Sequence, residues 1–136
     1  MYKQLKNNFF QAAFGSLVWV TLLCSFTDFF SQVAFSYFWH LIAISLIIGS
    51  VFGILYPYLW SYATLKAPLT ILICTVVNTL CGFACVYLYS PQMFELVRPF
   101  FFAVLLLTLV LHILMFYFYS KYENKKMAVT LNRLHH

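Results

Sequence analysis

The side chain in this sequence most able to do chemistry is His112, which lies in the apolar run 100–119. That run holds no Asp, Glu, Lys or Arg. A histidine in a lipid environment is costly, so it is treated as a functional hypothesis by default. Two interpretations stay open: a structural hydrogen-bond layer that fixes helix register, and a small-ligand pocket or protonation switch centred on His112. Catalysis is not indicated, because there is no Ser/His/Asp set, nucleotide-binding loop or carboxylate pair.

Other polar or small side chains are predicted to lie at the depth of His112. At 1.5 Å per helical residue, His112 lies about 18 Å below Phe100 at the outer edge, which leaves about 12 Å to the inner edge of a hydrocarbon core about 30 Å thick. Asn78 lies about 13 to 14 Å from Leu69, the end of its own run on the same side. The other two apolar runs also reach this level with small or polar residues. The ligand-binding candidates are therefore His112, Asn78, Thr108, Ser50, Trp19 and Ser16.

The four cysteines lie in apolar runs, and none is spaced as C-x-x-C. They are predicted to be small buried residues rather than a disulfide framework, a zinc site or a thiol enzyme. At 100° per residue, Cys74, Cys81 and Cys85 share a narrow stripe with Asn78, which we expect to face other helices. Thiolates favour soft metals, but no carboxylate or level histidine completes a ligand set, so no metal site is predicted.

No cofactor is predicted from the histidines. His40 and His112 differ by more than about 10 Å in depth, which disfavours a bis-histidine haem within one chain. Haem or lipid binding by the His112 layer remains a weaker alternative.

The second apolar run contains a stripe of small residues, in which Ser45, Gly49 and Gly53 are spaced four apart. This pattern contains G-x-x-x-G and lets another helix backbone approach closely. The approaching helix is expected either within the same chain or from a second copy.

Four uncharged apolar runs carry these residues: 9–26, 37–60, 69–89 and 100–119. Each is close to the roughly 20 residues that cross a bilayer as a helix. Short connections between them predict an all-α, up-down four-helix membrane bundle, with 1–136 as a single membrane domain and 120–136 as its basic tail. The chain is 64% hydrophobic and 8% charged. Soluble domains are about a quarter charged, which excludes a soluble enzyme, a disordered chain and a free nucleic-acid-binding domain.

The basic residues are sorted by side. With the N-terminus inside, only Arg98 of the eight Lys and Arg residues lies on the outer side. The positive-inside rule therefore predicts cytoplasmic termini. The tail has a basic amphipathic pattern, which indicates either an anchor on anionic lipid or a docking surface for a cytoplasmic partner. The docking candidates are Lys66, Lys125, Lys126, Leu131 and Arg133.

The length and layout resemble a family of small four-helix bacterial membrane proteins, catalogued as a domain of unknown function (DUF 3021). The matching stretches are residues 47–54, which carry Gly49 and Gly53, and the short loop around Lys66. Members of this family are often encoded beside LytTR-type DNA-binding regulators, and some such membrane partners restrain the regulator. The resemblance implies a protein of the bacterial cytoplasmic membrane that holds a cytoplasmic regulator. It carries over no functional residue.

These observations together predict a non-catalytic integral membrane protein that restrains a cytoplasmic partner, such as a DNA-binding regulator, in response to a signal. Its predicted partners are the bilayer and the regulator, without direct nucleic-acid binding. The alternative is a small homo-oligomeric transporter or channel subunit. Its copies would meet at the Ser45/Gly49/Gly53 stripe, and the His112 layer would line the path.

Overall fold

The computed structural model of this chain describes residues 1–26 and 37–134, with side chains described as far as Val129. Within those ranges the chain is helical, without strands. Among the described residues, four helices are long and apolar enough to cross a membrane, as the hydrophobic runs predict. In chain order these spans are Tyr2–Ser25, Phe38–Ser61, Ala67–Tyr89 and Pro91–Val129. The elements are α1 (Tyr2–Ser25), α3 (Phe38–Ile48), η2 (Gly49–Leu55), α4 (Tyr56–Ser61), α5 (Ala67–Tyr89), α6 (Pro91–Val97), η3 (Arg98–Phe100) and α7 (Phe101–Leu134).

Local sequence explains where α5 and α6 begin. Lys66 is extended and precedes the Ala67-Pro68 pair, which opens α5 where a missing backbone N–H costs nothing. Ser90 caps α6 by accepting a hydrogen bond from the Met93 amide at 3.3 Å, with Pro91 in the first turn. The stretch 90–99, expected as a loop, is therefore a short helix that turns the chain from α5 into α7.

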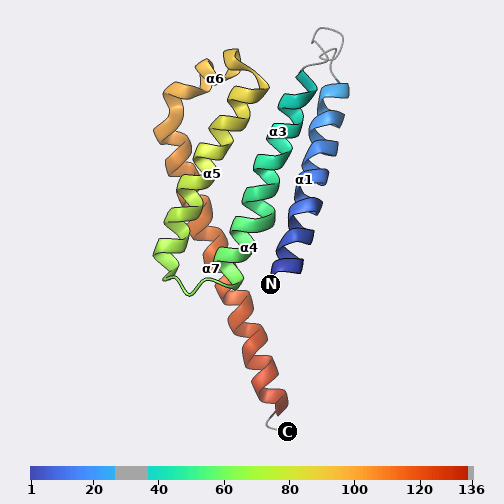
Figure 1. The fold of residues 1–136 in the computed structure, drawn as a ribbon. Coiled ribbons are helices and arrows are strands. Elements are labelled where there is room, and N and C mark those ends of the chain that lie inside the picture. Colours follow the sequence, from blue (N-terminus) through green and yellow to red (C-terminus); the bar gives the residue numbers. More distant parts are fainter. Residues whose placement is uncertain (27–36, 135–136) are drawn as a thin grey trace.

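The spans pack in sequence order. α1 lies against α3 and η2, α3 lies against α5, and α5 lies against α7 (Figure 1). α1 does not pack along α5 or α7, so the described helices do not close into a ring of four around one core. Lipid solvates apolar side chains as well as protein does, so no hydrophobic force closes such a ring.

The small-residue stripe of the second span is occupied by α1. A Cβ added at Gly49 would lie 2.7 Å from the Cβ of Ala13. A Cβ added at Gly53 would lie 2.5 Å from the Cα of Phe9. Ser45 is buried at the same contact face and donates its hydroxyl to the Ile42 carbonyl at 2.8 Å. Within this chain, the stripe therefore lets the α1 backbone approach closely.

The buried face of α5 is richer in threonine than the cysteine stripe suggests. Its buried residues are Thr70, Cys74, Thr75, Thr79 and Phe83. Cys81, Cys85 and Asn78 are only half-buried. The difference arises because α5 packs between α3 and α7, so contacts on two sides decide its orientation.

The second span changes its hydrogen-bonding register at η2, a seven-residue π-helical segment that leads into α4. Ser50 donates its hydroxyl to the Leu46 carbonyl at 2.8 Å, beside the start of this segment. π-helical turns are rare and frequently occur at functional sites. Here the segment ends immediately before Tyr56, which is the first residue of α4.

The two ends of the helix assembly differ in charge. The N-terminus, the connection between α4 and α5, and the C-terminal part of α7 lie at one end, and α6 lies at the other (Figure 1). The first end carries Lys3, Lys6, Lys66 and the α7 lysines, whereas Arg98 follows α6. α7 runs 34 residues and its C-terminal part projects beyond the other helices. The expected tail is thus a helical continuation of the fourth span as far as Leu134.

Candidate functional site

A groove of about 590 Å³ opens between the second span and α7. One wall comes from η2 and α4, the other from α7, and Asn78 of α5 contributes between them. Its lining residues are Phe52, Tyr56, Pro57, Trp60, Ser61, Asn78, Thr108, Leu111, His112, Met115 and Tyr119. Leu111 and Met115 are largely exposed at its margin. In a bilayer, the groove would therefore open toward lipid.

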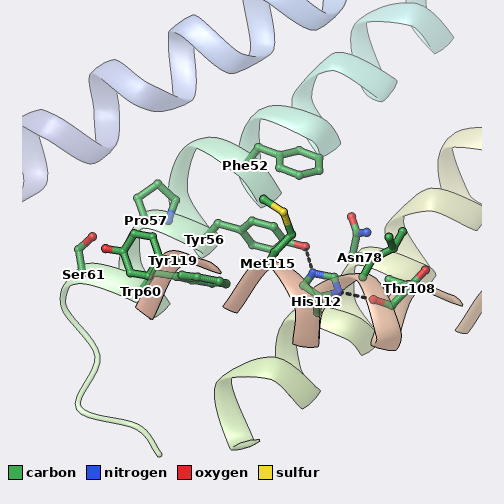
Figure 2. A pocket seen from close by; sticks show the side chains of 11 residues that line it. Phe52, Tyr56, Pro57, Trp60, Ser61, Asn78, Thr108, His112, Met115 and Tyr119 are labelled. Carbon is green, nitrogen blue, oxygen red and sulfur yellow. Dashed lines mark hydrogen bonds between the residues drawn. The ribbon is translucent and has the colours of Figure 1, made fainter. Parts of the chain in front are cut away.

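His112 joins three helices through hydrogen bonds. Its imidazole is 8% exposed. Nε2 lies 2.6 Å from the Tyr56 hydroxyl, which reaches it from α4 (Figure 2). Nδ1 lies 2.8 Å from the backbone oxygen of Thr108 on its own helix and 3.4 Å from the Thr75 hydroxyl on α5.

The partners of His112 determine the direction of these bonds. The Thr108 backbone oxygen can only accept, so Nδ1 carries the proton and donates it. In a neutral imidazole Nε2 is then the acceptor, and Tyr56 donates its hydroxyl proton to Nε2. The Tyr56 oxygen keeps its lone pairs, so toward the groove it acts as an acceptor.

Aromatic rings form much of the wall around this pair. Tyr56 packs edge-on against Phe52 at a centroid distance of 5.1 Å. Trp60 packs edge-on against Tyr119, also at 5.1 Å. This contact joins α4 to α7 on the C-terminal side of His112. These rings give the groove flat apolar surfaces beside one polar cluster.

Polar groups that make no hydrogen bond within the described part of the chain also line the groove, among them the side chains of Asn78 and Trp60. The Asn78 amide, half-buried on α5, has no partner there. The indole N–H of Trp60 is buried without a hydrogen bond and lies beside the Cys74 thiol, which is a weak acceptor at best. An unpaired amide is costly where water is excluded, so Asn78 is suited to bind a polar group entering the groove.

The structure brings together three of the six candidate ligand residues: His112, Asn78 and Thr108 all line this groove. Ser50 instead lines a second groove with Cys81, on a different face of the second span. Trp19 is 67% exposed on α1, and Ser16 donates its hydroxyl to the Ala13 carbonyl. Equal depth did not imply a common site, because depth says nothing about the direction in which a helix presents a side chain.

Tyr56, Trp60 and Thr75 were missed as site residues by sequence reasoning. The tyrosine and tryptophan resemble ordinary aromatic residues of the membrane interface. A helical side chain leans toward the N-terminus of its helix, so the Tyr56 hydroxyl reaches away from the end of α4 and toward His112. The spacing of Phe52, Tyr56 and Trp60, four apart, is the signal that could have indicated one aromatic face.

The partner-docking candidates lie away from the groove. Lys66 is exposed immediately before α5, and Lys125 and Lys126 are exposed on the projecting part of α7. The side chains of Leu131 and Arg133 lie outside the described residues. Among residues whose placement is described, no group of three or more His, Cys, Asp or Glu could hold a metal ion.

No family model, curated protein or solved structure matches this chain.

Proposed function

We propose that this chain is a non-catalytic membrane receptor that binds a small ligand in the His112 groove and holds a cytoplasmic partner protein on the basic end of α7. The partner is a soluble regulator, such as a DNA-binding protein, and the chain does not itself bind nucleic acid. Its membrane is the bacterial cytoplasmic membrane, with both termini in the cytoplasm.

The observation that carries this proposal is the continuity of α7. One uninterrupted helix, Phe101–Leu134, contains both His112 and the exposed Lys125 and Lys126. From His112 to Lys125 the helix rises by 13 residue steps, which span about 20 Å. No loop separates the groove from the projecting segment, so a tilt of α7 at the groove displaces the basic end.

The groove is placed where a ligand would alter that tilt. It lies between two helices that do not pack extensively on each other but share α5 as a neighbour. A ligand that binds one arrangement of α7 better than another shifts the population toward it. The partner is then held or released according to which arrangement predominates.

The groove supports binding rather than catalysis. Tyr56 and His112 are hydrogen-bonded to each other, and the remaining wall is mostly apolar. The Ser45/Gly49/Gly53 stripe, on which the transporter alternative places a second copy, is covered by α1 in this structure. The receptor proposal needs no displacement of that helix.

The test is retention of a cytoplasmic protein on the tagged, membrane-extracted chain. A protein identified by mass spectrometry should be retained by the wild type and lost after deletion of residues 121–136, with the spans still inserted. The K125E/K126E variant should lose it too, because charge reversal replaces attraction by repulsion. Reversal on α1, K3E/K6E, is the matched control and should leave retention unchanged. Equal retention by both charge variants and by the deletion would overturn the proposal.

A further inference from the structure

We propose that the His112 groove binds a membrane-soluble ring alcohol, such as an alkyl phenol, whose hydroxyl donates to Tyr56 and accepts from Asn78. The inference rests on the proposed function for its biological role, since the ligand would be the signal that the receptor reads. Its chemical content rests on the groove alone.

The donor requirement follows from the His112 tautomer. The proton on Nδ1 is fixed by the Thr108 backbone oxygen, and Tyr56 uses its own proton on Nε2. With His112 neutral, the Tyr56 oxygen can therefore only accept from a ligand. A ketone, an ether or an ester, which brings no proton, finds no donor in this pair.

The second half of the polar match comes from Asn78. Its side chain lines the same groove from α5 and makes no hydrogen bond within the described residues. An amide N–H₂ can donate to the ligand oxygen while the ligand proton goes to Tyr56. A hydroxyl satisfies both groups at once, since it is one donor and an acceptor with two lone pairs.

The body of the ligand is indicated by the walls. Phe52, Trp60 and Tyr119 present aromatic surface, and Leu111 and Met115 complete an apolar margin that is exposed at the lipid-facing side. A volume of about 590 Å³ lies within the range of small-molecule sites. A flat ring fits against aromatic walls, and an apolar chain can extend past Met115 into the bilayer.

The test compares 4-decylphenol with 4-decylanisole, which share ring and chain and differ by the missing O–H. Binding to the full chain in detergent micelles is followed by the emission of Trp60, in a W19F/W39F background, and by equilibrium dialysis against empty micelles. We expect the phenol to bind about tenfold more tightly than its methyl ether, the effect of one hydrogen bond in a dry site.

Two variants and one control locate the effect. Tyr56→Phe should lower phenol affinity to that of the ether. Asn78→Ala should weaken binding of both compounds, because the ether oxygen can also accept from the amide, and should leave the phenol preferred. Tyr58→Phe, on the same helix but lining the second groove, should bind like the wild type. Equal affinity of phenol and ether in the wild type overturns the inference, as does a preference that survives in Tyr56→Phe. Equal affinities would indicate that the groove binds only acyl chains.

Ligand binding and partner retention are measured independently of each other. Phenol binding is measured on the purified chain without any partner, and partner retention depends on Lys125 and Lys126, which do not line the groove. If Tyr56→Phe does not fold, as judged by circular dichroism, the phenol-to-ether comparison in the wild type and Asn78→Ala still decides.

Discussion

His112 is the residue through which the second, third and fourth spans meet by side-chain hydrogen bonds. Tyr56 comes from α4, Thr75 from α5, and the Thr108 carbonyl from the turn before His112 on α7. Each ring nitrogen thus has a partner, which is what burial of an imidazole requires. Two interpretations of His112 were left open by the sequence: a structural hydrogen-bond layer and a ligand pocket. In the structure, both involve the hydrogen-bonded atoms of His112 and Tyr56. The hydrogen bond to His112 orients the Tyr56 hydroxyl, which lines the groove.

The hydrogen bond between His112 and Tyr56 should couple the two side chains energetically. His112→Leu leaves the Tyr56 hydroxyl without its acceptor and should lower the free energy of unfolding by about 1–3 kcal/mol. Tyr56→Phe should cost less, and the double variant should cost less than the sum. The expected coupling is about 0.5–2 kcal/mol, in the range of interhelical hydrogen bonds in membranes.

The measurement is reversible unfolding of the four proteins of this cycle in mild detergent. Tyr58→Phe is the control, because Tyr58 is an exposed tyrosine on the same helix that lines a different groove. Strictly additive effects in the cycle would show that the 2.6 Å contact contributes nothing to stability.

The second span determines how the helices are placed relative to one another. Its small-residue face admits the α1 backbone, and its aromatic face meets α7 across the groove. The π-helical segment η2 contains Gly53 and immediately precedes Tyr56. One short segment therefore influences both the docking of α1 and the direction of the tyrosine.

A glycine substitution tests the docking of α1 on this span. Gly53→Ala would place a Cβ 2.5 Å from the Cα and 2.6 Å from the N of Phe9, so two backbones must move apart. The free energy of unfolding should fall by about 1–3 kcal/mol, as in an overpacked core. Gly82→Ala is the matched control, since its Cβ meets nothing within 4 Å and alanine favours helix over glycine. An unchanged stability in Gly53→Ala, measured by the same unfolding assay, would contradict the close backbone contact.

The whole molecule is polarised along the helix axes. The N-terminus, the connection containing Lys66 and the projecting part of α7 share one end (Figure 1). By their position between and after the four spans, seven of the eight Lys and Arg residues, all except Arg98, are assigned to that end. Because basic segments are retained in the cytoplasm, this end is predicted to be cytoplasmic.

Single-cysteine labelling tests that orientation. In a background with the four native cysteines replaced, Asn124→Cys should react with a membrane-impermeant maleimide only after cells are opened. Met93→Cys, on α6 at the opposite end, should react in intact cells. The opposite labelling pattern would place the termini outside and remove the basis for a cytoplasmic partner on α7.

From the sequence alone, a helical chain with four helices long and apolar enough to cross a membrane could be predicted, and the structure has both. Four uncharged apolar runs can satisfy their backbone in lipid only as helices, so neither conclusion needed tertiary information. The sequence also identified His112 as the polar side chain to explain, because an imidazole in an apolar run stands out whatever surrounds it. The arrangement of the expected bundle was less well determined, since α1 packs on the second span and not along α5 or α7.

Tertiary structure alone decided which residues meet at the site. Depth could be counted along each run, but the rotation of each helix depends on its neighbours, and η2 changes that rotation within the second span. Ser16, Trp19 and Ser50 therefore share a level with His112 without sharing its groove. Tyr56 lies nearer the end of its span, and its long side chain reaches His112 across the groove. Such a contact depends on side-chain direction and length, which residue spacing along a single run does not contain.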